Sequence, residues 1–330
     1  MKIKKILITG GAGFIGHHVI LNLLKQTNYQ IISIDRLDYS GSYNRIEQII
    51  NQNDSWKKRV SIIWHDLKAE INPITAKKIN KPDIILHLAA ASHVDRSIED
   101  PMSFVLDNVV GTVNLLNYSR NLKNLEKFVY FSTDEVFGPA PLNTKYKEND
   151  RYNSGNPYAA SKAGAEEMCV AFKNTYKMPI IITHTMNVMG ERQHPEKFLP
   201  KIINSVLNQK TLTIHSNKKK TKAGSRFYIH AQDVADAINF ILENGKLGEK
   251  YNIVGSKELD NLQLALIVSN HIGKKLKYKF VDFHSSRPGH DLRYALSGTK
   301  LKKMGWQPKK NIEQRIKDTV DWTMQNKEWL

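Results

Sequence analysis

The 330-residue sequence predicts an α/β fold built on a doubly wound parallel sheet, with a second, smaller domain in the C-terminal half. In the first half, short β-branched runs alternate with helix-length amphipathic segments, which is the pattern of a parallel sheet covered by helices on both faces. After about residue 185 the alternation stops, and loops, basic residues and isolated helices become more frequent. We interpret this second part as a substrate-binding domain.

The strands and helices of the first half are predicted in order from these runs. The strands are Lys5–Thr9, Gln30–Asp35, Val60–His65, Ile84–Ala89, Lys127–Ser132 and Pro179–His184, and the helices between them include Phe14–Lys25, Met102–Asn121 and Tyr158–Tyr176. The segment Phe227–Glu243 has the pattern of a strand and a helix that return to the first domain. The predicted division is therefore discontinuous, with 1–185 and about 227–255 in one domain and about 186–226 and 256–330 in the other.

Composition restricts the class of protein. Hydrophobic residues make up 41% of the chain, which excludes a disordered or collagen-like protein. Cys169 is the single cysteine, so no intrachain disulfide can form and we expect a reducing compartment, the cytoplasm. The first apolar run, Ile6–Ile8, is too short for a secretory signal, and no uncharged stretch is long enough to cross a bilayer. We expect no membrane association.

The chain is strongly basic. It has 49 Lys and Arg against 32 Asp and Glu, a formal charge of +17, with the densest run at Lys218–Lys220 and Lys222. We interpret the charge as a lysine-rich surface, scattered through the chain, that attracts an anionic ligand, and we do not expect nucleic acid as a partner.

A glycine-rich stretch directly follows the first predicted strand and opens the first predicted helix. Glycines let the backbone turn tightly and approach a pyrophosphate, whose charge is favoured at a helix N-terminus. The candidate dinucleotide-binding residues in it are Gly10, Gly13, Phe14, Ile15 and Gly16.

Asp35 ends the second predicted strand, about twenty residues beyond the glycine loop. A carboxylate there hydrogen-bonds the 2′-hydroxyl of the adenosine ribose and repels a 2′-phosphate, so NAD is favoured over NADP. The neighbouring Arg36 leaves NADP open as an alternative.

Two further strand ends complete the predicted cofactor site. Asp66 and Leu67 follow the third strand, where Asp66 would either cap a helix or contact the adenine. Leu88, Ala89 and Ala90 end the fourth strand, where small residues allow a flat cofactor to lie against the strand tips.

Tyr158 and Lys162 are four residues apart in a predicted helix, so both project from one face. A phenol is a poor base at neutral pH, and a nearby cation stabilises the phenolate and lowers its pKa. The pair is therefore a candidate for acid–base chemistry.

A third motif, Ser132–Gly138, follows the fifth strand and includes Thr133, Asp134 and Glu135. Together with the glycine loop, Asp35, Tyr158 and Lys162, it resembles the extended short-chain dehydrogenase/reductases, which have a Rossmann sheet. Thr-Asp-Glu followed by Val-Phe-Gly resembles the dTDP-glucose 4,6-dehydratase branch. Ordered matches elsewhere extend the resemblance across nearly the whole chain: Ala91–Ser97, Asn187 with His194–Pro200, and Arg287–Tyr294.

The resemblance implies an NAD-dependent lyase that converts dTDP-glucose to dTDP-4-keto-6-deoxyglucose. It implies that Tyr158 removes the 4-hydroxyl proton during C4 oxidation, that Thr133 polarises the same oxygen, and that Lys162 tunes the phenol and binds the nicotinamide ribose. Glu135 would then remove the C5 proton, and protonated Asp134 would assist loss of the 6-hydroxyl as water. Ser132 is expected beside the cofactor.

The resemblance also implies residues that bind the nucleotide-diphosphate hexose and a homodimer paired through the helices around Met102–Asn121 and Tyr158–Tyr176. It implies no metal, since the mechanism has no use for one. The expected substrate-binding residues are His93, Ser97, Asn187, Lys197, Arg226, Arg287 and His290.

Several alternatives remain open at this point. UDP-glucose or UDP-N-acetylglucosamine is an alternative substrate, because Ala91, Phe137, Met189 and Ser297 depart from the family pattern. Dehydration coupled to C5 epimerisation is a further alternative, because the mechanism already has a base at C5. A nucleotide-sugar 4-epimerase or decarboxylase would share the NAD site but would not need both Asp134 and Glu135. A catalytically silent NAD-binding protein is the alternative outside enzymes.

Overall fold

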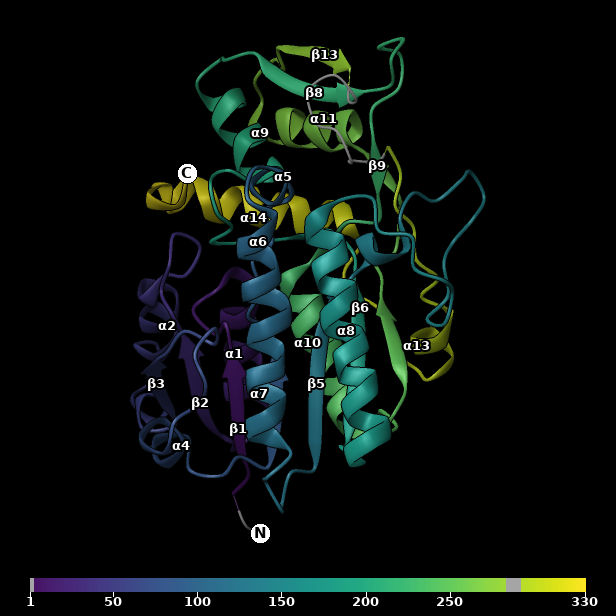
Figure 1. Ribbon diagram of the computed structural model, residues 1–330. Coiled ribbons are helices and arrows are strands. Elements are labelled where there is room, and N and C mark those ends of the chain that lie inside the picture. The colour runs from purple at the N-terminus through teal and green to yellow at the C-terminus, as the bar shows by residue number, and fades with distance from the viewer. Residues whose placement is uncertain (1–2, 283–291) are drawn as a thin grey trace.

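The computed structural model describes residues 3–282 and 292–330 of the chain. Within them, the central feature is a seven-stranded sheet in which all neighbours pair in parallel, in the order β11-β6-β5-β4-β1-β2-β3 (Figure 1). The strands are β1 (Lys5–Thr9), β2 (Gln30–Asp35), β3 (Val60–Trp64), β4 (Ile84–His87), β5 (Lys127–Thr133), β6 (Ile180–Thr185) and β11 (Lys250–Ile253). The doubly wound fold and the six predicted strands are confirmed, with differences of at most two residues at an end.

Helices cover both faces of the sheet. One face packs against α1 (Phe14–Gln26), α2 (Tyr43–Ile50) and α10 (Ala231–Asn244), and the other against α4 (Pro73–Ile79), α7 (Gly111–Ser119) and α8 (Pro157–Tyr176). Figure 1 shows α7 and α8 in front of the sheet and α10 behind it. In β1, Ile6 and Ile8 enter one core and Leu7 the other, which is why these strands are continuous apolar runs in the sequence.

The predicted helix Met102–Asn121 is interrupted. It consists of α6 (Pro101–Phe104), a π-helical segment η1 (Val105–Val110) and α7. In the π-helical segment, the side chain of Asn108 exchanges hydrogen bonds with the backbone of Ala91 at 2.8 and 3.1 Å and donates to Ser161 Oγ at 2.8 Å. These contacts join the loop after β4 to α8. Wider helical turns of this kind are frequent at functional sites.

The second part of the chain forms a cap above the carboxyl ends of the strands (Figure 1). Its core contains Ile202, Ile214, Val268 and Ile316. The elements of the cap are α9 (Phe198–Leu207), β8 (Leu212–Ser216) paired in parallel with β13 (Tyr278–Asp282), β9 (Ser225–Arg226) paired with β12 (Leu259–Asp260), α11 (Asn261–Ile272) and α14 (Ile312–Gln325).

The chain returns to the first core differently from the prediction. The short strand in the segment Phe227–Glu243 is β10 (Ile229–His230), which pairs with β7 (Val188–Met189) outside the main sheet. The strand that pairs with β6 at the edge of the main sheet is β11. Further along, Leu301 of α13 (Thr299–Lys303) and Trp306 also pack into the first core.

Short helical turns complete the described chain: α3 (Asp54–Lys57), α5 (Val94–Glu99), η2 (Asp134–Phe137) and η3 (Lys327–Trp329). In residues 3–282 and 292–330, no helix combines the length and the apolar character needed to cross a membrane.

The strand order places the functional site. The chain runs outward in opposite directions from β1 and β4, which are neighbours in the sheet. In open parallel sheets a crevice forms at such a switch point, outside the carboxyl ends of the strands. The glycine loop follows β1 at this crevice, and the loop of Leu88–Ala90 follows β4.

Candidate active site

A cavity of about 400 Å³ lies at the carboxyl ends of the strands, beneath the cap. That size suits a ligand of cofactor or nucleotide-sugar class. The structure brings most of the predicted site residues to its wall: Gly10, Gly13, Phe14, Ile15, Gly16, Asp35, Asp66, Leu67, Leu88, Ala89, Ala90, Ser132, Thr133, Asp134, Glu135, Tyr158, Lys162, Asn187 and Lys197.

The glycine loop has a geometry that side chains would disrupt. Gly10 has φ +72°, and a Cβ there would lie 2.8 Å from the backbone nitrogen of Ala89. A Cβ on Gly16 would lie 2.2 Å from the carbonyl oxygen of Gly10. Because only glycine fits, the backbone at the start of α1 stays open to a phosphate group.

Asp35 lies beside this loop at the end of β2. Its carboxylate accepts hydrogen bonds from the backbone N–H groups of Ala12 at 3.1 Å and Leu37 at 2.9 Å. Burial raises the pKa of Asp35, while those two N–H groups act in the opposite direction. An acceptor in this place fits the ribose hydroxyls of a dinucleotide.

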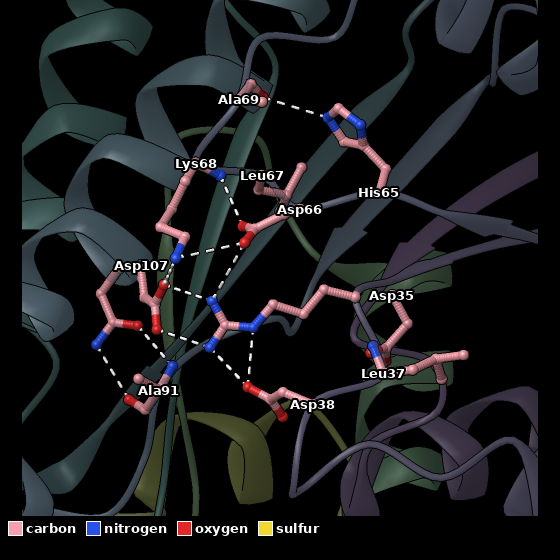
Figure 2. Close-up of polar contacts among 12 residues, drawn as sticks. Asp35, Leu37, Asp38, His65, Asp66, Leu67, Lys68, Ala69, Ala91 and Asp107 are labelled. Carbon is pink, nitrogen blue, oxygen red and sulfur yellow. Dashed lines mark hydrogen bonds and ion pairs between the residues drawn. The ribbon is translucent and has the colours of Figure 1, made fainter.

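Arg36 forms hydrogen bonds with Asp38 and Asp107, which are labelled in Figure 2. Its terminal nitrogens donate to both carboxylate oxygens of Asp107 at 2.5 and 2.8 Å, and its Nε donates to Asp38 at 2.8 Å. The hydrogen bonds to Asp107 are the largest of the contributions that raise the pKa of Arg36. Asp66 lies 3.7 Å away on the same guanidinium, and its Oδ1 also accepts the N–H of Lys68, as in an Asx turn.

Two acids follow β5 at the other end of the cavity. Asp134 is 4% exposed; its Oδ1 accepts a hydrogen bond from Thr133 Oγ1 at 3.1 Å, and its Oδ2 has no hydrogen-bond partner among the described residues. Burial, followed by the charge of Glu135, raises the pKa of Asp134 to about 7, while the charge of Arg226 acts in the opposite direction. Asp134 is therefore placed to hold a proton near neutral pH.

Glu135 has a different environment. Its carboxylate accepts a hydrogen bond from the side-chain amide of Asn156 at 3.1 Å, and its side chain is less buried than that of Asp134. A donor that points at the carboxylate favours its ionised form. Adjacent acids in different surroundings can thus serve as an acid and a base.

Tyr158 and Lys162 lie on one face of α8, and both are buried. Tyr158 shares a hydrogen bond with Thr133, but burial, followed by the charge of Glu135, raises its pKa. Lys162 donates to the carbonyl oxygen of Phe131 at 2.7 Å, and burial lowers its pKa to about 8. In the protein alone, burial therefore outweighs the expected effect of Lys162 on the phenol.

Known proteins are similar to this chain over nearly its whole length. The model of the GDP-mannose 4,6-dehydratase family matches residues 7–319. The chain belongs to this family. The dTDP-D-glucose 4,6-dehydratase of Bos taurus is 36% identical over 329 residues, covering 98% of this chain and 89% of the relative, and the dTDP-glucose 4,6-dehydratase of Salmonella typhimurium is 34% identical, covering 99% and 94%.

Solved structures of the family and its neighbours have the same fold. A dTDP-glucose 4,6-dehydratase from Streptomyces venezuelae, with NAD bound, has a TM-score of 0.89 at 32% identity and covers 98% of both chains. A UDP-glucose 4-epimerase from Thermus thermophilus, in complex with NAD, has a TM-score of 0.87 at 28% identity and covers 97% of this chain and 99% of that one. Because epimerases share the fold with the GDP-mannose 4,6-dehydratase family, the site residues must distinguish the activities.

Some predicted substrate residues lie away from the cavity wall. Ser97 is buried, donates to the carbonyl oxygen of Val94 at 2.6 Å and accepts the N–H of Tyr158 at 3.1 Å, so it supports the start of α8. His93 Nε2 lies 3.5 Å from Glu196. Neither is among the described residues that line the cavity.

Arg226 also lies outside the described wall. Its guanidinium donates to the carbonyl oxygens of Ser225 at 2.7 Å and Leu292 at 3.0 Å and lies over the ring of Tyr294. Arg287 and His290 fall outside the described residues.

Two residues with clear contacts were not predicted. Asn156 accepts the N–H of Ala159 as the N-cap of α8 and also donates to Glu135. The sequence signal for it was an asparagine directly before Pro157 at a helix start. Asp107, which holds Arg36, had no such signal, because its contact spans 71 positions and depends on the π-helical segment.

Across residues 3–282 and 292–330, no group of three or more His, Cys, Asp or Glu side chains is arranged to hold a metal ion.

Proposed function

We propose that the protein is an NAD-dependent dTDP-glucose 4,6-dehydratase that forms dTDP-4-keto-6-deoxyglucose. The observation that carries the proposal is the pair Asp134 and Glu135 beside Tyr158, in which one acid has a pKa of about 7 and the other accepts a hydrogen bond. A 4-epimerase needs only oxidation of C4 and return of hydride to C4, whereas an elimination needs an acid and a base for C5 and C6 as well.

The residues at the glycine loop fit NAD. Gly10 and Gly16 leave a space that a Cβ would fill, and Asp35 presents a carboxylate to the ribose end. Ser132 Oγ is buried with no hydrogen-bond partner among the described residues, as expected for a group that faces a bound ligand. When bound, NAD would be held by Gly10, Gly16 and Asp35, and it would supply a hydride acceptor for C4 and a hydride donor for C6.

Tyr158 and Thr133 carry the proton transfer of the oxidation step. The hydrogen bond between them lets both approach the 4-hydroxyl oxygen of the sugar, with Tyr158 as the base. Lys162 lies one turn further along α8 and keeps a charge that stabilises phenolate when the site is occupied. The raised pKa of Tyr158 means that the phenol keeps its proton until substrate and cofactor bind.

Glu135 and Asp134 carry the elimination. Glu135 takes the C5 proton, which the 4-keto group has made acidic, and the C5 electrons form the double bond to C6. Asp134 gives its proton to the departing 6-hydroxyl, so that the C6–O bond breaks and water leaves. Protonated Glu135 then returns a proton to C5 as C6 is reduced, which completes the product.

The nucleotide diphosphate is assigned to the cap side of the cavity. Asn187 and Lys197 line that side, and the charge of Arg226 reaches the site, as its effect on Asp134 indicates. Cationic side chains are the natural partners of a diphosphate. Arg287 and His290 are proposed to join them on the resemblance alone.

The proposal includes a homodimer in the cytoplasm. The side chains of Met102, Val105 and Leu106 are 64%, 41% and 41% exposed on adjacent segments of one helix, so a second copy would cover apolar surface there. The single cysteine, Cys169, is buried and suits a reducing compartment. Sedimentation equilibrium of the purified protein, with Met102→Lys as a variant, tests the dimer; a monomer at all concentrations would exclude it.

Mass spectrometry tests the activity. The protein is incubated separately with dTDP-glucose, UDP-glucose and UDP-N-acetylglucosamine, with and without added NAD, beside Glu135→Gln. We expect wild type, and not the variant, to remove one water from dTDP-glucose. Loss of water from a UDP-sugar alone would contradict the assignment of dTDP-glucose as the substrate. Isomerisation without a change of mass would indicate a 4-epimerase.

A further inference from the structure

Arg36 lies where a phosphate-binding residue is expected. It directly follows Asp35, the carboxylate proposed for the adenosine ribose, and both line the cavity. In dinucleotide sites an arginine near this position accommodates the 2′-phosphate of NADP. The sequence alone therefore leaves NADP open as the cofactor. The contacts of the Arg36 side chain decide whether Arg36 is available to bind a 2′-phosphate.

The Arg36 guanidinium is held by acids from three different segments (Figure 2). Asp107 of η1 binds it through both carboxylate oxygens, Asp38 binds Nε from the loop after β2, and Asp66 lies 3.7 Å away after β3. We name these three acids the Arg36 clamp. Asp107 is the central member because its two parallel hydrogen bonds match the planar fork of the guanidinium.

The clamp is partly shielded from water. The side chains of Arg36 and Asp107 are 28% and 11% exposed, so their attraction is screened less than that of a surface pair. Lys68 lies 3.4 Å from Asp66 and 3.9 Å from Asp107, which leaves two cations among three acids. A 2′-phosphate would have to displace Arg36 from Asp107 while approaching this excess of negative charge.

We propose that Asp107 determines the dinucleotide selectivity of the enzyme by holding Arg36 in the clamp, so that Arg36 is not free to bind the 2′-phosphate of NADP. The inference rests on the proposed function, since it assumes that the site binds a dinucleotide. Asp35 disfavours the phosphate locally, and Asp107 removes a neighbouring cation, Arg36, that would compensate for it. Without Asp107, the Arg36 guanidinium loses its bidentate partner and becomes available to a 2′-phosphate, so NADP becomes a competitor.

The experiment measures which dinucleotide the purified protein keeps. Wild type, Asp107→Ala, Asp107→Asn, Arg36→Gln and the double variant Arg36→Gln/Asp107→Ala are equilibrated with equal concentrations of NAD and NADP and separated from free ligand. The retained dinucleotides are then released by denaturation and quantified by chromatography. Glu99→Gln is the matched control, because Glu99 is an exposed acid of the preceding helix, α5.

We expect wild type and Glu99→Gln to keep NAD, and Asp107→Ala to raise the NADP-to-NAD ratio by about tenfold or more, as loss of a bidentate charged pair allows. The double variant should return to the wild-type ratio, because the gain requires Arg36. Should Asp107→Ala misfold, Asp107→Asn, which keeps the side-chain shape, gives the same comparison.

Two results would overturn the inference alone: wild type keeps NAD and the ratio is unchanged in both Asp107 variants, or the ratio stays raised in the double variant. If wild type keeps neither dinucleotide, the proposed function fails and the inference fails with it.

Discussion

The two ends of the cavity hold the same type of side chain in opposite surroundings. At the adenosine end, Asp107 and its neighbours share the guanidinium of Arg36, and the charges compensate one another (Figure 2). At the catalytic end, Asp134 is buried beside Glu135, and its pKa rises to about 7. Carboxylates paired with a cation stay ionised and can contribute to ligand binding and selectivity. A buried carboxyl without a cationic partner can hold a proton near neutral pH and donate it in a reaction. The clamp and the acid pair should therefore respond in opposite ways to the same substitution.

The largest expected effect comes from removing the base. Glu135→Gln keeps the side-chain shape but cannot accept the C5 proton, so we expect dehydration of dTDP-glucose to slow by about 10²–10⁴-fold. The oxidation half of the reaction should survive, and reduced nicotinamide should accumulate in its absorbance band after mixing with substrate. Glu167→Gln, at an exposed acid of α8, is the control and should keep wild-type turnover. Full activity in Glu135→Gln would assign the base elsewhere.

Removing the charge of Asp134 should stabilise the fold. A carboxyl whose folded pKa is about 7, against 3.8 ordinarily, costs stability progressively as pH rises from 3.8 to 7. We expect Asp134→Asn to gain about 2–4 kcal/mol at pH 8 and roughly half of that at pH 5, while losing activity. Thermal unfolding of wild type and Asp134→Asn at both pH values checks this. If the variant is no more stable than wild type at pH 8, the ionised carboxylate of Asp134 does not destabilise the fold.

A smaller effect separates the two roles of Asn156. Serine caps a helix about as well as asparagine but is too short to reach Glu135, so Asn156→Ser should lose less than about 1 kcal/mol of stability. Turnover should fall by about tenfold, the size of one charge-assisted hydrogen bond. Asn156→Ala, which loses the cap as well, should be less stable than Asn156→Ser at similar turnover. Steady-state kinetics and urea unfolding measure both, and unchanged turnover in Asn156→Ser would remove Asn156 from the site.

The smallest expected effect is at Asp107, which is paired with Arg36. Its substitution should lower the free energy of unfolding, whereas Asp134→Asn should raise it. Asp107→Asn removes a charge that Arg36 compensates, so the free energy of unfolding should fall by about 0.5–1 kcal/mol at pH 8. Urea unfolding beside Asp134→Asn tests the contrast directly. A gain of stability in both variants would mean that net charge, and not pairing, decides the response.

Local patterns in the sequence were sufficient for the sheet and for much of the site. The glycine loop, Asp35 and the acids after β5 all lie at strand ends, and the carboxyl ends of parallel strands meet at one edge of a sheet. The placement of such residues therefore follows from the order of the strands.

Contacts that depend on packing could not be predicted. Asp107 contacts Arg36 from a π-helical segment, and no residue pattern marks that segment in the sequence. Ser97 stays a predicted substrate residue, and the structure adds that its hydroxyl donates to the carbonyl oxygen of Val94 and accepts the N–H of Tyr158. The second contact depends on the packing of α5 against α8.

The net positive charge is distributed unevenly along the chain. Residues 197–226 and 261–281 contain twelve of the 49 Lys and Arg and none of the 32 Asp and Glu, so most of the net charge of +17 falls in two segments rather than being scattered. Both segments belong to the cap, where they pair through β8 and β9 with later parts of the chain. The uneven distribution of charge is visible in the sequence. That the two basic segments lie in the same domain is visible only in the fold.

The most direct test is a titration of the Asp134 carboxyl. Carbon-13 NMR of protein labelled at its aspartate carboxyl carbons, with the Asp134 signal assigned by its absence in Asp134→Asn, gives the pKa of this one group. We expect a midpoint near pH 7. A midpoint near the ordinary value of 3.8 would mean that Asp134 is ionised at neutral pH, and the assignment of an acid and a base to adjacent residues would be wrong.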